Sequence, residues 1–289
     1  MTEPTPLPAT SVALLADWAT RTPYAPWLFY RRGWDWQWRS WRRVADQVAR
    51  GAERLRGWAS DGAAAGPAPH IAFEGRQDPD TVAVGLAIEA IDAVGVPFPG
   101  REREFVEQAA QEGCVAWAGV EGAMPAEPVP ETLERIALPP ALSALERTPR
   151  QSLHVEHEPA VGSATVSLIA DARQLDHRVP LSARRDIVCA APSLTPGAMR
   201  QLQAWTLVRG AAWVLEPYAD AFVPTVLWAR PTIACGSAAD LAPLAGELED
   251  RKHRRHSRLA TILAVGAAPI GPTLWADLEV EIVELGENR

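Results

Sequence analysis

The residue types that hold nucleotide phosphates are scarce in this sequence, and their spacing does not suit that chemistry. A phosphate cradle usually needs closely spaced glycines, whose backbone N–H groups can approach the anion, and a cation that reaches the phosphates. Of the 20 glycines, no two are adjacent or separated by a single residue, and Lys252 is the only lysine. The sequence therefore predicts no glycine-rich phosphate loop.

Histidines and carboxylates come close together at two places. On a strand, His154, Glu156 and Glu158 would share one face, as metal ligands do. His253 and His256 are three residues apart. Neither group has further ligands at a spacing known for metal sites, so we predict no metal.

No nucleophile stands in a recognisable catalytic pattern. Ser163 follows Gly162, but the second glycine of a Gly-x-Ser-x-Gly turn is missing. Asp176 and His177 are adjacent, which does not make them a catalytic pair because triads are defined by geometry. Three widely spaced cysteines favour buried thiols in a reducing compartment over a disulfide framework. We expect neither a hydrolase nor any catalytic residue.

A basic cluster lies late in the chain and comprises Arg251, Lys252, Arg254 and Arg255. Its ordinary interpretation is a solvated helix end or a loop before a strand. The alternative is a patch that meets an acidic surface of a partner protein.

Tryptophan is unusually frequent, with 12 residues. Five of these cluster early in the chain, at positions 27, 34, 36, 38 and 41. We expect them to pack in a hairpin or at the edge of a core. A protein contact is the alternative, because tryptophan is enriched at binding hot spots.

Bulk composition narrows the class of protein. The 289 residues are 47% hydrophobic and 22% charged, which is typical of a globular chain. A formal charge of −8 argues against nucleic-acid binding, which needs a basic surface. The N-terminus has no basic segment followed by a long apolar run, so we predict no signal peptide, no membrane helix and a cytoplasmic location.

Strand and helix patterns alternate along the chain, which favours parallel βαβ units. In the first part we expect a helix over 11–20 with Ser11 as N-cap, a hairpin of strands 27–30 and 34–38, a long helix after Ser40, a strand over 70–73, a helix capped by Asp80, a strand over 94–97, a helix over about 101–111 and a strand over 114–118. Segment 119–150 holds six prolines and is expected to be a linker or an extended crossing segment.

The pattern then resumes, with strands expected over 165–169, 186–190, 211–215, 225–228, 259–265 and 280–283, and helices over 195–208 and 237–249. We therefore predict an α/β fold with two βαβ-type subdomains and mostly parallel sheets. The first subdomain would cover 1–150, with the proline-rich linker at its end, and the second 151–289.

Short segments in a particular order carry a family resemblance. They are residues 14–18 with Pro23, 36–38, 71–73, 87–97, 185–188, 210–215, 222–227 with 230–232, and 265–269. Their order resembles the N-terminal domain of the adenylate-forming superfamily, which includes acyl-CoA synthetases, peptide-synthetase adenylation domains and luciferases. The resemblance implies that Gly266, Ala267, Ala268 and Pro269 stand where the family's segment lies against the adenine.

The departures from the family pattern are as informative. The family's phosphate loop should follow a strand near residue 169, yet residues 169–182 contain no glycine, threonine or lysine and include Asp171 and Asp176. Of the family's Tyr-Gly-x-Thr-Glu, whose Thr and Glu hold phosphate and magnesium, only Gly286 is kept. Asp92 stands where the family usually has a glycine. The C-terminal domain with its catalytic lysine is not in the sequence.

The effect of these departures on activity can be estimated from the free energy of a single lost contact. Losing one electrostatic contact to a transferring group costs about 3–4 kcal/mol. Several such contacts would be missing together, so we expect negligible adenylation and no cofactor.

The resemblance and the departures together imply a non-catalytic homologue of an acyl-CoA synthetase. It would act as a binding or scaffolding partner in acyl or aryl-acid metabolism, with an acyl carrier protein or an active synthetase as its partner. Self-association is a further expectation. One alternative is a reduced AMP-forming acid ligase that uses ATP and magnesium with a separate C-terminal domain. Another is a protein that binds an acyl or aromatic acid in the former acyl pocket.

Overall fold

The computed structural model describes residues 10–33, 35–60, 68–121, 124–125, 129–140, 164–183, 185–250, 257–265 and 281–285. The chain divides into two compact units. Unit 1 comprises Met1–Ala25 and Arg39–Ile169, and unit 2 comprises Pro26–Trp38 and Ala170–Arg289. The boundary predicted near residue 150 falls outside the described residues.

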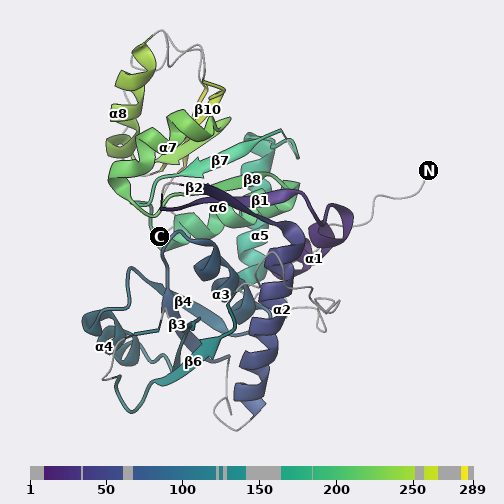
Figure 1. Cartoon of the computed structure of the whole chain (residues 1–289), viewed down its shortest axis with the longest axis vertical. Coiled ribbons are helices and arrows are strands. Elements are labelled where there is room, and N and C mark those ends of the chain that lie inside the picture. The colour runs from purple at the N-terminus through teal and green to yellow at the C-terminus, as the bar shows by residue number, and fades with distance from the viewer. Residues whose placement is uncertain are drawn as a thin grey trace, which may run out of the picture. The chain divides into compact units, whose positions relative to one another are not determined.

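Unit 1 is built on a parallel sheet of four strands in the order β4-β3-β5-β6 (Figure 1). Its strands are β3 (His70–Glu74), β4 (Val94–Phe98), β5 (Ala116–Val120) and β6 (Glu134–Leu138). Its helices are α1 (Ser11–Arg21), α2 (Trp41–Trp58), α3 (Pro79–Glu89) and α4 (Arg103–Gln111).

Helix α2 holds the helical layer of unit 1 together. It packs against α1, α3 and β6. Val44, Val48 and Leu55 are fully buried along one stripe of this helix, as its steps of three and four residues predict. Close packing of α2 on α3 depends on Gly51, where an added Cβ would come within 2.9 Å of the Ala87 Cβ.

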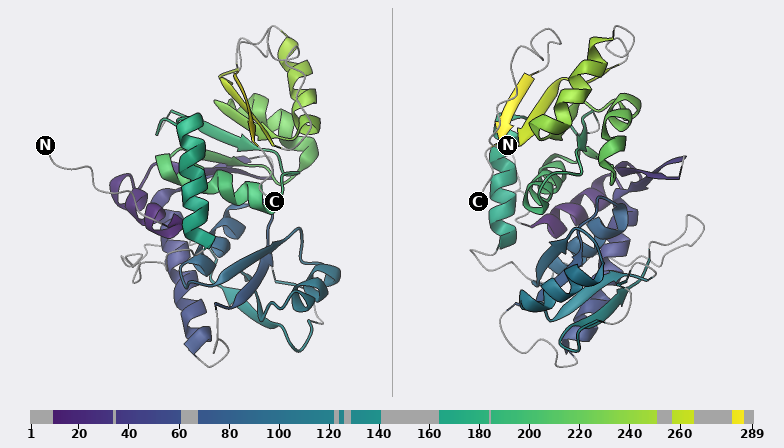
Figure 2. Two further views of the ribbon diagram at one scale, coloured as in Figure 1. Left: turned by 180° about the vertical axis from the view of Figure 1, so that it is seen from behind. Right: turned by 90° about the vertical axis from the view of Figure 1, so that its left-hand side faces the viewer.

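Unit 2 is built on a sheet of seven strands in the order β11-β10-β9-β7-β8-β1-β2. The strand pairs β1–β8, β8–β7, β7–β9, β9–β10 and β10–β11 are parallel, and β10 and β11 lie side by side in Figure 2. Its strands are β1 (Pro26–Arg32), β2 (Asp35–Ser40, whose last two residues belong to unit 1), β7 (Ile187–Ala190), β8 (Ala212–Leu215), β9 (Ile233–Gly236), β10 (Thr261–Val265) and β11 (Glu281–Leu285).

The helices of unit 2 complete alternating strand–helix units. They are α6 (Pro196–Arg209), α7 (Phe222–Ala229) and α8 (Ala238–Glu249), while α5 (Ala164–Arg178) begins in unit 1 and ends in unit 2. Helices α7 and α8 supply Phe222, Leu241 and Leu244 to one buried core, which also contains Cys189 from the sheet. The α/β class with mostly parallel sheets is therefore confirmed.

Two strand predictions are wrong, and helical periodicity explains both. Residues 165–169 belong to α5, where Ile169, Ala172 and Leu175 are buried one turn apart. Residues 225–228 belong to α7, where Phe222 and Val226 are buried four residues apart. β-branched residues in both segments favoured a strand, but burial on one helical stripe prevailed.

Three further expectations need correction. Thr10, not Ser11, caps α1 and accepts the Ala13 N–H at 3.1 Å. Asp78, not Asp80, caps α3. Segment 119–150 is more than a linker, because it contributes β6 to the sheet of unit 1.

Asp92 has a positive φ of 56°, the backbone conformation that favours the glycine expected there from the resemblance.

Candidate functional site

The strand order of unit 2 points to one place for a ligand. In open parallel sheets, ligands bind beyond the carboxyl ends of two adjacent strands whose connections run in opposite directions. Strand β7 leads through α6 to β8 on one side, and β9 leads through α8 to β10 on the other. The carboxyl ends of β7 and β9 therefore form the topological switch point of unit 2.

A carboxylate with its own hydrogen bonds lies at this switch point. Asp240, in the first turn of α8, accepts hydrogen bonds at Oδ2 from the Ser237 hydroxyl at 2.6 Å and from the Ser237 N–H at 2.9 Å. Ser193, in the loop after β7, donates to the same oxygen at 2.5 Å. All three donors are neutral, so the negative charge of Asp240 has no cation against it in these contacts.

The two strand ends are also tightly packed. A Cβ added at Gly236, the last residue of β9, would lie 3.0 Å from the Asp240 Cβ and 3.2 Å from the Ala191 Cβ. Glycine is therefore needed for close packing of strand against helix here.

Helix N-termini at this edge are occupied by the chain's own side chains. Exposed N–H groups and the helix dipole make a helix N-terminus attractive to phosphate. At α6, the Thr195 hydroxyl accepts the Ala198 N–H at 3.3 Å. At α8, the Ser237 hydroxyl accepts the Asp240 N–H at 3.4 Å in a capping box. Each cap uses a donor that a phosphate would otherwise bind.

A buried carboxyl group follows β8. Glu216 is 1% exposed and accepts the Thr225 hydroxyl at 2.6 Å and the Tyr218 N–H at 3.2 Å. Burial, and then the charge of Glu216, raises the pKa of the Cys189 thiol. Burial, and then Cys189, likewise raises the pKa of Cys235. Both thiols are buried, and a raised pKa disfavours the thiolate that a nucleophile needs.

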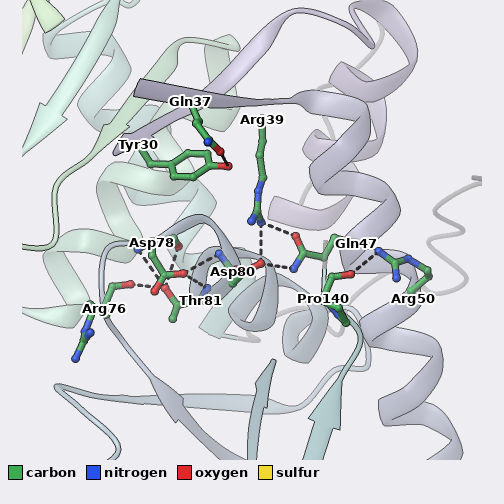
Figure 3. Close-up of polar contacts among 10 residues, drawn as sticks. All are labelled: Tyr30, Gln37, Arg39, Gln47, Arg50, Arg76, Asp78, Asp80, Thr81 and Pro140. Carbon is green, nitrogen blue, oxygen red and sulfur yellow. Dashed lines mark hydrogen bonds and ion pairs between the residues drawn. The ribbon is translucent and has the colours of Figure 1, made fainter. Parts of the chain in front are cut away.

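Unit 1 has a switch point of its own. Strand β3 leads through α3 to β4, and β5 leads to β6 on the opposite side. Asp78 caps α3 by accepting the Asp80 N–H at 2.8 Å and the Thr81 N–H at 3.0 Å (Figure 3). Burial raises the pKa of Asp78 above its usual value. This helix terminus is also filled by the chain itself.

A hydrogen-bonded triad lies beside the same helix terminus. Arg39 is 6% exposed, and its Nη1 donates to Gln47 Oε1 at 2.8 Å and to Asp80 Oδ1 at 2.9 Å. Gln47 Nε2 donates to the same Asp80 oxygen at 2.8 Å, as Figure 3 shows. The guanidinium is committed to these internal partners, so the triad joins β2, α2 and α3 and has a structural role.

Several residues predicted from the sequence lie outside the described part of the chain. They are Gly266, Ala267, Ala268, Pro269 and Gly286 of the degenerate nucleotide site, Arg251, Lys252, Arg254 and Arg255 of the basic cluster, and His154, Glu156 and Glu158. These assignments stay predictions.

The expected place of the missing phosphate loop needs correction. Residues 169–178 are helical, and Asp176 pairs with Arg209, with Oδ2 2.7 Å from Nη2. A loop between a strand and a helix would have to lie between β6 and α5. That segment contains one glycine, Gly162, and no lysine.

Sequence reasoning missed the group formed by Ser193, Ser237 and Asp240. Ser237-Ala-Ala-Asp240 follows the spacing of a capping box and could have revealed the start of α8. Nothing in the sequence indicated that Ser193, 47 residues from Asp240, would join it.

Metal-binding clusters and membrane-spanning helices are absent from the described residues. No group of three or more His, Cys, Asp or Glu side chains in this part of the chain could hold a metal ion. None of the helices within it is both long and apolar enough to cross a bilayer.

Comparisons with known proteins place the fold. No protein-family model and no curated protein matches the sequence. The structure of IdnL1 is similar with a TM-score of 0.72, at 17% identity over 97% of this chain and 60% of IdnL1. The nonribosomal peptide synthetase FmoA3 gives a TM-score of 0.72 at 17% identity, over 99% of this chain and 32% of FmoA3.

A third structure belongs to the acyl-CoA ligases. The long-chain-fatty-acid-CoA ligase FadD1 from Archaeoglobus fulgidus gives a TM-score of 0.70 at 13% identity, over 99% of this chain and 64% of FadD1. The chain thus spans less than two thirds of each of these proteins. The likeness confirms the expected fold, that of adenylate-forming enzymes.

Proposed function

We propose that this chain, which has the fold of the N-terminal region of adenylate-forming enzymes, forms no acyl adenylates. It serves instead as a binding or scaffolding partner in acyl or aryl-acid metabolism. Its partner would be an acyl carrier protein or an active synthetase. The proposal needs no nucleotide, magnesium or other cofactor.

One observation carries the proposal most directly. At the switch point of unit 2, the Asp240 carboxylate accepts three hydrogen bonds from neutral donors. An incoming phosphate would meet a negative charge there, and at a few ångströms this repulsion amounts to about 1–4 kcal/mol per pair of unit charges. The neighbouring helix termini are already capped.

The composition supports the same conclusion. The only lysine is Lys252, and no two glycines are adjacent or one residue apart. The segment between β6 and α5 therefore has neither the closely spaced glycines nor the lysine of a phosphate loop.

The direct test is an assay of pyrophosphate release. Purified protein is mixed with ATP, magnesium and a panel of fatty, aryl and amino acids, with an active acyl-CoA synthetase as positive control. We expect release indistinguishable from that without protein, and no heat of ATP binding by calorimetry. Turnover, or ATP affinity in the micromolar range, would support a reduced ligase and refute the proposal.

A second candidate, an acid-binding protein, is favoured by two buried indoles. Trp205 and Trp213 are 0% and 2% exposed, and neither Nε1 has an acceptor within the described residues. Leaving such a buried donor unpaired costs about 1–3 kcal/mol. A bound carboxylate could accept these N–H groups.

The second candidate has its own matched test. A thermal-shift screen with fatty and aryl acids should raise the melting temperature if a ligand binds the folded state. Trp205→Phe or Trp213→Phe should then abolish the shift. Trp27→Phe is the control, because the Trp27 Nε1 already donates to the Thr206 hydroxyl at 3.4 Å. A shift unchanged in all three variants would exclude these indoles as the site.

A further inference from the structure

Three tryptophans and one arginine of unit 2 form a surface that the sites above do not use. We call it the tryptophan face, and it consists of Arg31, Trp36, Trp38 and Trp228. Trp36 on β2 stacks on Trp228 of α7, with ring centroids 4.3 Å apart and planes 1° from parallel. Trp38 is 52% exposed and Trp228 is 59% exposed.

The hairpin places these residues on one face. The Tyr30 hydroxyl donates to Gln37 Oε1 at 3.2 Å, so these two side chains lie on the same face of the hairpin. Their neighbours Arg31 and Trp36 therefore lie on the other face. Trp38, two residues beyond Trp36 on β2, shares that face.

Arg31 brings a positive charge to this aromatic surface. The ion pairs of the described residues do not include it, and its buried Nε has no hydrogen-bond partner among them. Arginine and tryptophan are the residue types enriched at binding hot spots. A carboxylate that pairs with Arg31 would lie much closer to it than the Debye length. The acidic residues that give the chain its net charge of −8 lie elsewhere, and salt largely screens their repulsion.

The same hairpin supplies a backbone for pairing. In the sheet order, β2 is the last strand on its side, and the right view of Figure 2 shows the dark hairpin extending away from the other strands of unit 2. An edge strand presents N–H and C=O groups that can pair with another extended segment. Alternate side chains of such a segment would lie against the tryptophan face.

We propose that the tryptophan face docks an extended segment of a partner protein, in which apolar and acidic side chains alternate, beside β2. The apolar side chains pack on Trp38 and Trp228, and an acidic side chain pairs with Arg31. This docking rests on the partner-binding role proposed above and names the surface and the chemistry of that partner.

The test uses the full chain and synthetic peptides of known sequence. The probe is a fluorescein-labelled ten-residue peptide of alternating Glu and Val, measured by fluorescence anisotropy at 150 mM salt. Two further peptides carry Lys in place of Glu, or N-methyl groups on alternate residues. We expect micromolar binding of the Glu peptide, and at least tenfold weaker binding of the other two.

Variants of the chain then locate the contact. Arg31→Glu and Trp228→Ala should each weaken the Glu peptide at least tenfold, and Trp228→Phe should weaken it less than Trp228→Ala. Tyr24→Ala and Tyr218→Ala remove rings that are 76% and 60% exposed elsewhere, and should change binding less than twofold. Unchanged near-ultraviolet circular dichroism shows that a variant is folded.

Four outcomes would overturn the docking proposal. They are no binding of the Glu peptide, equal binding of the Lys or N-methylated peptide, full binding by folded Trp228→Ala, and a concentration-dependent dimer lost in Trp228→Ala, which would assign the face to a second copy. Pyrophosphate release is assayed separately, so failure of the docking surface is distinguishable from failure of the non-catalytic role.

Discussion

The switch points of the two sheets obey the same topological rule but are filled by different chemistry. In unit 1, the carboxylate of Asp80 at the start of α3 is paired with the buried Arg39 guanidinium and with Gln47. In unit 2, the carboxylate of Asp240 at the start of α8 is held only by hydroxyls and a backbone N–H in the contacts seen. Among the described residues, Asp80 is paired with a cation and Asp240 is held by neutral donors.

The difference shows two ways in which a carboxylate at the start of a helix is held. In unit 1, the positive charge of Arg39 offsets Asp80, and the network joins three elements of the unit. In unit 2, the charge of Asp240 remains at the place where open parallel sheets bind ligands. We therefore expect the triad of Arg39, Gln47 and Asp80 to be chiefly structural, and Asp240 with its two serines to be chiefly a helix cap.

The largest expected effect comes from Arg39→Met in unit 1. This change leaves the Asp80 carboxylate and the 4% exposed Gln47 without the Arg39 guanidinium that donates to both. Because the guanidinium is buried but the Asp80 side chain is 37% exposed, losing these charged hydrogen bonds should cost about 2–3 kcal/mol. Urea unfolding measures the loss. Arg21→Met is the control, because its ion pair with Asp17 is on the surface and its loss should cost under about 1 kcal/mol. Equal losses in both variants would contradict a structural role.

The next effect compares the switch-point glycines of the two units. A Cβ at Gly75 would lie 2.9 Å from the Pro97 Cβ and 3.3 Å from the Phe98 carbonyl oxygen. Gly75→Ala should therefore cost about 2 kcal/mol, and Gly236→Ala about 1 kcal/mol, by overpacking.

A glycine of α8 supplies the control for this pair. Gly246 has nothing within 4 Å of an added Cβ, so Gly246→Ala should stabilise the helix by up to about 1 kcal/mol. Midpoints of chemical unfolding compare the three variants. Stabilisation by Gly75→Ala or Gly236→Ala would show that these strand ends are less tightly packed than described.

A smaller effect is expected when the carboxylate of unit 2 is removed. Asp240→Ala deletes one half of the capping box and the acceptor of the Ser193 hydroxyl, at a cost of about 1 kcal/mol. The loss should be well below that of Arg39→Met, as thermal unfolding would show. A loss as large as that of Arg39→Met would mean that the group of Ser193, Ser237 and Asp240 organises its unit as the triad of unit 1 does.

The smallest effect concerns pH and Asp78. Burial raises the folded-state pKa of this carboxyl above the 3.8 of the unfolded chain. The folded state therefore binds this proton more tightly than the unfolded chain does. The protonated Asp78 carboxyl contributes fully to the stability of the fold below pH 3.8, and this contribution is lost as the pH rises through the folded-state pKa. The stability of the native chain relative to Asp78→Asn should fall over that window. A relative stability that rises with pH would show the opposite shift.

Sequence periodicity anticipated most of the fold, because local patterns determine local structure. The stripe of α2 and the cap at Ser40 follow from residue types within one or two turns. The burial along β2 does not alternate, because Trp38 is exposed and Arg39 is buried. The two misassigned segments, in α5 and α7, are short runs of β-branched and apolar residues. Strand and helix are both locally acceptable for such runs, and packing on a sheet decides between them.

By itself, the sequence determined which residue types are available: Lys252 is the only lysine and no two glycines are adjacent or one residue apart, so no glycine-rich phosphate loop is predicted. Only the tertiary structure decided which polar groups meet, such as Ser193 with Asp240 and Arg39 with Asp80, and that Trp228 stacks on Trp36. The physical reason is sequence separation. These partners are 41 to 192 residues apart, so strand order rather than local propensity brings them together.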